Sequence, residues 1–260
     1  MKAIVLTFDR NRAITEHMML QYDRLWPDHP FCFRIPYQNR SGSNSDRREY
    51  IRAPGDTPEE IPAAVLKLLA DLNDEEWIYW CSDDKYPIQL VVAKIRDLMT
   101  YLRDGHDVSG LLFCRTRVTL DQPELTLYPA ERKTSLGDIL LERKSWYQIW
   151  IHQFLKVKVL RYFFMQMPHQ LSSAKAMDEL KNEIAKPDEF HLFVTRENFA
   201  VFGESTQRGS ITRNCLESIS RTDIELPEWF RRSNGQRVTM GELQAVRSPW
   251  SKWKKRLFSA

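Results

Sequence analysis

Two adjacent carboxylates follow an apolar, aromatic segment in the first half of the chain. Residues 76–87 read EWIYWCSDDKYP, so Asp83 and Asp84 come directly after the strand-like run Trp77–Cys81. Two carboxylates at the end of a buried strand are costly to ionise unless positive charge meets them. A divalent cation that is held by oxygen ligands and bridges to a diphosphate would supply that charge. The alternative is a solvated turn in which Asp84 pairs with Lys85 or caps the next helix.

A second polar turn follows the first predicted strand, Ala3–Phe8. The sequence there changes from AIVLTF to DRNR. Such a turn places backbone groups, an aromatic face and a carboxylate where a nucleoside could bind, and guanidinium groups suit phosphate oxygens. A polar loop over residues 40–48 adds further arginines, although for any one arginine we favour a solvated side chain. The predicted nucleotide contacts of these two segments are Thr7, Phe8, Asp9, Arg10, Arg12 and Arg48.

Alternating strand and helix signals position these turns. Apolar runs typical of strands are Ala3–Phe8, Phe31–Ile35, Tyr50–Arg52, Trp77–Cys81, Val108–Arg115, Phe190–Val194 and Phe199–Phe202. Helical patterns are found in Ala13–Trp26, a segment beginning near Pro58, Ile88–Arg103, Trp146–Met167, Ser172–Ile184 and Thr212–Ile219. The alternation predicts one α/β, Rossmann-like domain with a mostly parallel central sheet flanked by helices. Ligands of such a sheet bind at the carboxyl ends of its strands, where both polar turns stand.

The segment Trp146–Phe164 is densely aromatic. Its aromatic faces could stack on pyranose rings. Aromatic residues at helical spacing more often pack in a core, and we favour core packing here.

The composition limits the class of protein. Of 260 residues, 42% are hydrophobic and 28% are charged, so the chain can bury enough apolar surface to fold. A net charge of only +3 excludes a generally basic nucleic-acid-binding protein, and no nucleic-acid partner is expected. The four cysteines show no CxxC or Cys/His spacing, which argues against a structural zinc site. No segment resembles a signal peptide or a membrane-spanning helix, so a cytoplasmic protein with reduced thiols is predicted.

Basic residues concentrate at the C-terminal end. Residues 247–258 read RSPWSKWKKRLF, with Trp250, Trp253 and Leu257 spaced as on one helix face. This composition is typical of an interfacial helix on an anionic bilayer, which would attach the protein peripherally to the inner face of the membrane. The alternative is a helix that docks on the domain through its tryptophans.

Three segments together resemble a GT-A-fold glycosyltransferase: AIVLTFDRN at the N-terminus, WIYWCSDD about seventy residues later, and GESTQRGSITRN late in the chain. The resemblance covers most of the first 220 residues. It implies a nucleotide-sugar bound across the first half of the sheet and an acidic motif of the Asp-x-Asp type that holds Mn²⁺ or Mg²⁺ on the donor's diphosphate. Here the motif is Ser82-Asp83-Asp84-Lys85, which matches Asp-x-Asp in neither register. Lys85 or Arg208 could therefore replace the metal.

The resemblance also implies particular site residues. The donor and metal contacts that it implies are Ser82, Asp83 and Arg208 for the nucleotide-sugar, and Asp84 and His191 for the metal ion. Sugar transfer displaces a nucleoside diphosphate from the anomeric carbon, and an inverting enzyme needs a base for the acceptor hydroxyl. The candidate catalytic bases are Glu204, in a glycine-flanked loop, and Asp138, which could instead cap a helix.

The sequence therefore predicts a glycosyltransferase that moves a sugar from a nucleotide-sugar donor to a glycan or lipid-linked acceptor, in cell-surface polysaccharide or glycolipid synthesis. Residues 1–230 would form the catalytic domain, with the donor half in 1–115 and the acceptor half in 116–230, and residues 231–260 the basic tail. One alternative is a sugar nucleotidyltransferase, but this would need a glycine-rich phosphate loop, and the turn FDRNR contains no glycine. The other is a non-enzymatic nucleotide- or membrane-binding module, which would leave the paired carboxylates unexplained.

Overall fold

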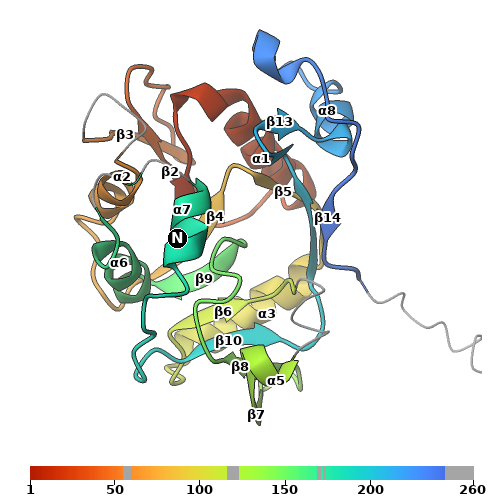
Figure 1. Cartoon of the computed structure of the whole chain (residues 1–260). Helices are drawn as coiled ribbons and strands as arrows, with labels where there is room; N and C mark the ends of the chain where they lie inside the picture. Colours follow the sequence, from red (N-terminus) through yellow and green to blue (C-terminus); the bar gives the residue numbers. More distant parts are fainter. Residues whose placement is uncertain (55–59, 116–122, 169–170, 172–173, 244–260) are drawn as a thin grey trace, which may run out of the picture.

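A nine-stranded sheet forms the centre of the molecule (Figure 1). The computed structural model describes residues 1–54, 60–115, 123–168, 171 and 174–243. In spatial order the strands are β3 (Arg48–Arg52), β2 (Cys32–Tyr37), β1 (Lys2–Leu6), β4 (Trp77–Ser82), β9 (Gln153–Lys156), β6 (Gly110–Leu112), β10 (Leu192–Thr195), β8 (Ile139–Arg143) and β7 (Leu127–Lys133). Strands β9 and β8 are antiparallel to their neighbours, and the other strands share one direction. The mostly parallel α/β sheet that the sequence predicts is confirmed.

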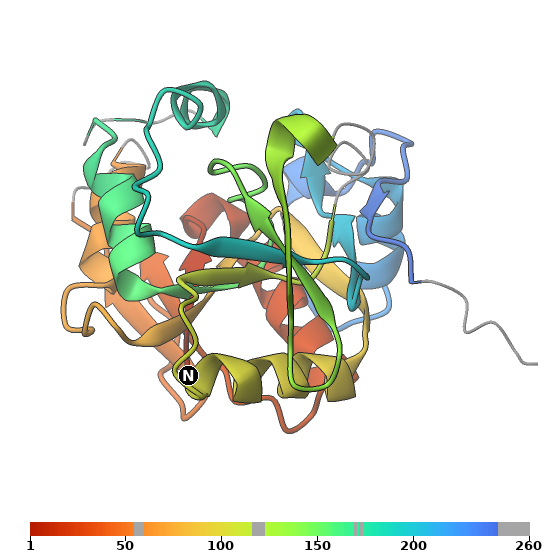
Figure 2. The same cartoon turned by 90° about the horizontal axis from the view of Figure 1, so that it is seen from below.

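Helices cover both faces of this sheet. Successive side chains of a strand point to opposite faces, so Ala3 and Val5 pack on one side and Ile4 on the other. The first face is covered by α1 (Arg12–Leu25), α3 (Val92–Arg103) and α8 (Arg213–Ile219), and the second by α2 (Ile61–Leu68), α6 (Val157–Met165) and α7 (Ala174–Leu180). Figure 2 shows α3 lying along its face of the sheet. Shorter helical segments are α5 (Pro123–Thr126), η1 (Asp9–Asn11) and η2 (Glu228–Phe230).

A smaller three-stranded sheet begins directly after the two carboxylates. Its strands are β14 (Thr239–Met240), β11 (Ala200–Glu204) and β5 (Lys85–Leu90), with β11 antiparallel to both neighbours. A hairpin of β12 (Thr206–Gln207) and β13 (Ser210–Ile211) follows β11. Because β14 pairs with β11, the fold extends past the predicted domain boundary at residue 230. The basic segment 247–258 lies outside the described residues.

Two segments that the sequence predicts as helices contain strands. The predicted helix Ile88–Arg103 is wrong at its start, because α3 begins at Val92 and the preceding residues form β5. The predicted helix Trp146–Met167 is wrong over its first part, where β9 lies between β4 and β6. A short apolar run that is buried on all sides has no polar face, so periodicity cannot separate a helix from a strand. Hydrogen bonds to two strands distant in sequence decide the conformation of β9.

Most aromatic side chains of segment 146–164 pack in the core. Trp146, Phe163 and Phe164 are buried in the apolar cluster on the α6 side of the sheet, and Phe154 is buried in the cluster on the other side. Core packing is therefore confirmed for these four residues. Trp150 is only partly buried and lines a cavity described below.

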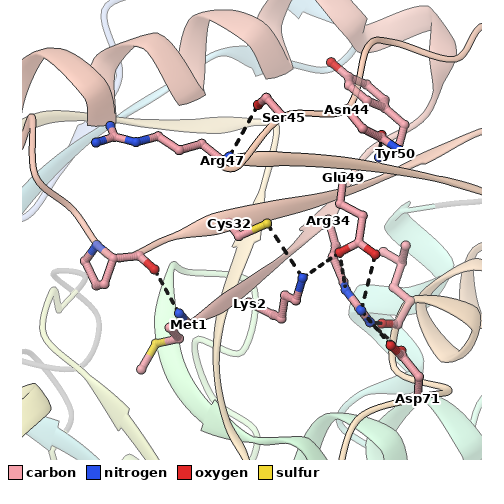
Figure 3. Close-up of polar contacts among 12 residues, drawn as sticks. Met1, Lys2, Cys32, Arg34, Asn44, Ser45, Arg47, Glu49, Tyr50 and Asp71 are labelled. Atoms are coloured by element: carbon pink, nitrogen blue, oxygen red, sulfur yellow. Dashed lines mark hydrogen bonds and ion pairs between the residues drawn. The ribbon is translucent and has the colours of Figure 1, made fainter.

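A buried arginine joins the outer parallel strands (Figure 3). The Arg34 guanidinium on β2 donates to the two carboxylate oxygens of Asp71 over 2.6 and 2.7 Å, and to Glu49 of β3 over 3.0 Å. Lys2 of β1 donates to the same Glu49 carboxylate over 2.8 Å. Bidentate pairing of a guanidinium with a carboxylate is among the stronger polar contacts in proteins. These bonds hold together β1, β2 and β3, three parallel strands of the central sheet.

Two further observations concern membranes and redox state. None of the helices in the described part of the chain combines the length and the apolar character that a membrane span requires. All four cysteines are described, and they are free thiols. Cys81, Cys114 and Cys215 are buried, where a thiol packs as a small apolar group.

Candidate functional site

A cavity of about 560 Å³ opens at the carboxyl ends of β1 and β4. Its walls come from the polar turns after these two strands, from α2 and α7, and from the β12–β13 hairpin. Its charged lining residues are Arg10, Asp83, Asp84, Lys85, Asp178 and Arg208, and its aromatic ones are Phe8, Trp150 and Phe230. The volume is that of a small-molecule site, and the charged groups favour an ionic ligand.

Asp83 links the two polar turns through hydrogen bonds. Its backbone N–H donates to the carbonyl of Leu6 over 3.1 Å, and its Oδ2 accepts a hydrogen bond from the Thr7 hydroxyl over 2.6 Å. The Thr7 hydroxyl is in turn 2.6 Å from the hydroxyl of Thr15 on α1. Burial raises the pKa of Asp83 to about 7, although the hydrogen bond from Thr7 opposes the shift. The Asp83 side chain is therefore a fixed carboxyl group that titrates near neutral pH.

Asp84 forms an ion pair with the next residue. Lys85 Nζ donates to Asp84 Oδ2 over 2.8 Å, and the Ser82 hydroxyl donates to Oδ1 over 2.5 Å. Desolvation disfavours the charged form of Asp84, but Lys85 and Ser82 outweigh it and lower the pKa of this carboxyl. Both carboxylate oxygens of Asp84 are thus engaged within the turn. The pairing of Asp84 with Lys85, the alternative from the sequence, is present in the structure.

A buried histidine holds the end of β4 in place. His152 Nε2 lies 2.9 Å from the carbonyl oxygen of Ser82, and Nδ1 lies 2.7 Å from the hydroxyl of Tyr22. The Tyr22 hydroxyl is also 2.7 Å from that of Tyr79. Burial lowers the pKa of His152 to about 4, so the ring is neutral at pH 7. In that state Nε2 donates to the carbonyl and Nδ1 accepts from Tyr22, which orients the peptide that leads into Asp83.

A tight hairpin brings Arg208 to the cavity. Arg208 and Gly209 form the two-residue turn between β12 and β13, and their φ angles are 51° and 77°. Positive φ at both positions is typical of a type I′ turn, which matches the twist of the strands but strains a residue that carries a Cβ. The Arg208 side chain is exposed and has no hydrogen bond or ion pair with any other described residue. Its guanidinium is therefore available to a ligand.

Aromatic rings form the apolar part of the cavity wall. Phe8 follows β1, Trp150 precedes β9, and Phe230 belongs to η2. The guanidinium carbon of Arg10 lies 5.7 Å from the ring centroid of Trp229, next to Phe230. Flat apolar faces beside cationic groups suit a ligand that has both rings and negative charge.

Comparisons with solved structures identify the fold. The chain resembles residues 1–349 of S. aureus TarS, solved in complex with UDP-GlcNAc, at 13% identity and a TM-score of 0.51, over 87% of this chain and 68% of that chain. The order β3-β2-β1-β4 of its parallel half is that of doubly wound nucleotide-binding sheets. This chain has the GT-A fold.

Two further solved structures resemble the chain more weakly. The galactosyltransferase LgtC, solved with donor and acceptor sugar analogues, matches at 11% identity and a TM-score of 0.42, over 96% of this chain and 89% of that chain. A 2-C-methyl-D-erythritol 4-phosphate cytidylyltransferase from Francisella tularensis matches at 12% identity and a TM-score of 0.35, over 75% and 90% of the two chains. No protein-family model matches the sequence, and a search of curated proteins also gives no match.

Most predicted donor contacts of this GT-A chain line the cavity, and three do not. The Asp9 carboxylate accepts hydrogen bonds from backbone N–H groups of residues 38–40. Arg12 donates to Asp9 over 3.3 Å, and Arg48 lies 3.7 Å from a carboxylate oxygen of Asp23. Asp9, Arg12 and Arg48 are thus bound within the fold. The predicted residues that do line the cavity are Thr7, Phe8, Arg10, Ser82, Asp83, Asp84 and Arg208.

The two predicted catalytic bases lie in different places. Glu204 ends β11 opposite Lys85 of β5, beside the site but outside the cavity lining, and burial raises the pKa of its carboxyl. Asp138 precedes β8, which is four positions from β4 in the sheet. At roughly 4.8 Å per strand this separation is about 19 Å. Asp138 is bound there by Lys94 over 2.8 Å, so it is too distant to act in the cavity.

His191 and Asp84 lie at opposite ends of the parallel strands. His191 precedes β10 whereas Asp84 follows β4, and the two strands run in the same direction. The ring nitrogens of His191 lie 2.8 Å from Glu142 and 3.3 Å from Asp107. The prediction that Asp84 and His191 bind one metal ion is therefore wrong, because a single ion cannot contact side chains at both ends of the strands.

The residues around Asp84 do not fit a divalent cation. Mn²⁺ and Mg²⁺ need several oxygen ligands. The Asp84 carboxylate accepts one hydrogen bond at each oxygen, from Ser82 and from Lys85. An ammonium group 2.8 Å from the carboxylate would also repel a second cation. Across the described ranges, no three His, Cys, Asp or Glu side chains are grouped as metal ligands. The side chains available as metal ligands at this site thus differ from those that the resemblance implies.

Two residues that form one wall of the cavity, Trp150 and Asp178, are not among the predicted site residues. Asp178 on α7 accepts a hydrogen bond at Oδ1 from the indole N–H of Trp150 over 2.9 Å, and both residues line the cavity. Asp178 lies in an otherwise ordinary polar helix, and no motif marks it. Trp150 belongs to the aromatic segment for which sugar stacking was the alternative to core packing. Only the packing of distant segments brings the two residues to the site.

Proposed function

We propose that this protein is a glycosyltransferase that binds a nucleotide-sugar in the cavity and transfers the sugar to a glycan or lipid-linked acceptor. The observation that carries the proposal is the composition of the cavity wall at the carboxyl ends of β1 and β4. Three cationic side chains line it, namely Arg10, Lys85 and Arg208, together with aromatic rings. A nucleotide-sugar combines a diphosphate, which suits the cations, with rings that suit the aromatic faces. The GT-A fold is consistent with this ligand.

The turn after β1 favours sugar transfer over nucleotide transfer. A nucleotidyltransferase cradles a triphosphate with backbone N–H groups of a glycine-rich loop. In this chain the side chains of Thr7, Phe8 and Arg10 line the cavity at that turn, and the turn contains no glycine. The wall therefore offers side chains where a phosphate-binding loop would offer backbone.

Asp178 is the best-placed base for the acceptor hydroxyl. Asp178 is exposed and lines the cavity, whereas Glu204 is not among the lining residues. Trp150 and Lys181 both contact its Oδ1, so among the described residues Oδ2 has no partner and can accept a proton. A carboxylate with one unengaged oxygen is suited to general-base catalysis.

The acceptor class and the location are part of the same proposal. We expect an acceptor of cell-surface polysaccharide or glycolipid synthesis at the cytoplasmic face of a membrane. The composition of segment 247–258 supports this, because five lysines and arginines with no acid would attract an anionic bilayer.

Isothermal titration calorimetry with a panel of UDP-, GDP-, CMP- and dTDP-sugars tests the proposal, and UDP-GlcNAc is the first donor to try. We expect one nucleotide class to bind, and Arg10→Ala to weaken that binding about tenfold or more, because a charge-assisted hydrogen bond is lost. Arg221→Ala, at an exposed arginine whose side chain has no hydrogen bond or ion pair with another described residue, is the matched control and should bind as the wild type does. No binding of any nucleotide-sugar would refute the proposal.

A second arm of this experiment tests the base. Asp178→Asn keeps an oxygen acceptor for the Trp150 indole but cannot take up a proton. We expect donor affinity to stay within about twofold, while the slow release of nucleoside diphosphate from bound donor falls about a hundredfold. An unchanged rate of release would exclude Asp178 as the base.

A further inference from the structure

Lys85 occupies an unusual position for a lysine. It is only 7% exposed, yet it lines the cavity and follows two carboxylates at the end of a strand. A lysine side chain is rarely buried unless its charge is paired. Here the Asp84 carboxylate lies 2.8 Å from Nζ, and Glu204 stands opposite Lys85 on β11.

Two carboxylates surround the Lys85 side chain. Burial of an ammonium group is unfavourable unless its charge is paired, and here Asp84 lies 2.8 Å from Nζ while Glu204 is the cross-strand partner of Lys85. The ammonium group has three N–H donors. The Asp84 hydrogen bond uses one of them, which leaves N–H donors for a ligand in the cavity.

Two exposed guanidinium groups complete a cationic surface around this ammonium. Arg208, on the hairpin turn, has no ion pair with another described residue, and Arg10 contacts the face of Trp229. Both line the same cavity as Lys85. The two guanidinium groups can offset the negative charge of a bound diphosphate, and the Lys85 ammonium can donate hydrogen bonds to it, without any metal ion.

We infer that Lys85 is the cation that binds the donor's diphosphate, and that donor binding in this site needs no divalent metal. The inference rests on the proposed function. It accounts for the ammonium that lies 2.8 Å from the Asp84 carboxylate, where it would repel a second cation. Asp84 then serves as a positioning residue that holds Lys85 toward the cavity.

Lys85 also stabilises the charge that forms during transfer. When the bond between the anomeric carbon and the diphosphate oxygen breaks, its electron pair goes to that oxygen, and the diphosphate gains one negative charge. The acceptor oxygen forms the new bond to the anomeric carbon, and its proton passes to the Asp178 carboxylate. A hydrogen bond from the Lys85 ammonium to the leaving diphosphate is stronger after this charge develops, so it lowers the barrier.

Calorimetry with the donor identified above, in EDTA and in Mn²⁺, tests the inference on the wild-type full chain. We expect the same affinity within about twofold in both buffers. We expect Lys85→Met, which keeps the length of the side chain but removes its charge, to weaken binding about tenfold or more. Lys67→Met, at an exposed lysine of α2 outside the cavity, is the control and should bind as the wild type does.

A measurement on the wild type tests the inference even if Lys85→Met does not fold. Electron paramagnetic resonance of Mn²⁺, titrated with protein and donor, should show only the signal of the free ion. A signal of bound Mn²⁺ that depends on the donor would overturn the inference, as would donor binding in Mn²⁺ but not in EDTA. In both cases the proposed function would stand. Failure of the donor to bind in either buffer would instead refute the proposed function itself.

Discussion

At the scale of single residues, Asp83 is the group whose burial has the clearest consequence. Its residue is 7% exposed, and the Thr7 hydroxyl donates to its carboxylate. Burial raises the pKa of Asp83 to about 7, so the folded state binds the proton more tightly than the unfolded state does. The stabilisation from this proton is complete below the ordinary pKa of an aspartate, and it is lost as the pH rises through 7. The site therefore retains a carboxyl group that makes the fold less stable at alkaline pH.

Asp83→Asn should stabilise the protein, and more so at high pH. The amide keeps an oxygen that accepts from Thr7 but carries no charge. We expect the gain in the free energy of unfolding to be roughly 2 kcal/mol larger at pH 8 than at pH 5. Urea unfolding followed by circular dichroism at the two pH values measures this difference in the free energy of unfolding. Asp46→Asn, at an exposed position, should show no such difference. An equal gain at both pH values would contradict the raised pKa.

At the scale of elements, the β12–β13 hairpin shows a similar conflict between stability and ligand binding. Asn followed by Gly is the preferred pair for a type I′ turn, because Asn tolerates positive φ better than other residues with a Cβ. This chain instead has Arg208, at a φ of 51°, before Gly209. The strained conformation presents a guanidinium at the wall of the cavity. The sequence of the hairpin thus departs from local propensity, and the proposed contact of Arg208 with the donor would explain this departure.

Arg208→Asn should therefore stabilise the fold and weaken the site. We expect a gain of about 0.5–1 kcal/mol in the free energy of unfolding, from relief of backbone strain. We also expect a loss of about tenfold in donor affinity, from removal of the guanidinium. Urea unfolding and calorimetry measure the two effects. Arg221→Asn removes the same charge from an exposed position outside the hairpin and the cavity. If both variants bound the donor equally well, Arg208 would not contact it.

At the scale of the whole molecule, the cavity joins both halves of the chain. The predicted donor half, residues 1–115, supplies the two polar turns, and the predicted acceptor half, 116–230, supplies Trp150, Asp178, the hairpin and Phe230. Strand β14 then closes the smaller sheet against β11. Every lining residue precedes residue 231. Donor binding and membrane attachment should therefore be separable along the chain.

Deletion of residues 244–260 tests this separation. The shortened protein retains β14 and all cavity residues, so we expect donor affinity within about twofold of the full chain. We expect it to lose binding to vesicles that contain phosphatidylglycerol, because each basic residue near an anionic surface contributes about 1 kcal/mol. Cosedimentation with these vesicles measures the loss of binding, and neutral phosphatidylcholine vesicles are the control. Full binding by the shortened protein would place the membrane contact elsewhere.

Local sequence determined the first half of the sheet and the position of the site. Strands β1 and β4 and helix α1 begin and end within two residues of their predicted bounds. Each is marked by a sharp change between an apolar run and polar residues, a signal contained in neighbouring residues. The same change placed Asp83 and Asp84 at the carboxyl end of a strand, where an α/β sheet binds its ligands.

Only the tertiary structure decided the partners of these residues. Segment 153–156 forms β9 because two distant strands bind it, and Asp178 reaches the cavity because Met177 of α7 packs into the apolar cluster that α2 and α6 share. His191 is excluded from the site by the direction of β10, which no local pattern records. The sequence left three possibilities for Asp84, namely binding a metal ion, pairing with Lys85 or capping the next helix, and in the structure Lys85 Nζ lies 2.8 Å from its carboxylate. The choice between them depends on the burial and orientation of side chains, and these arise only when segments far apart in the chain pack together.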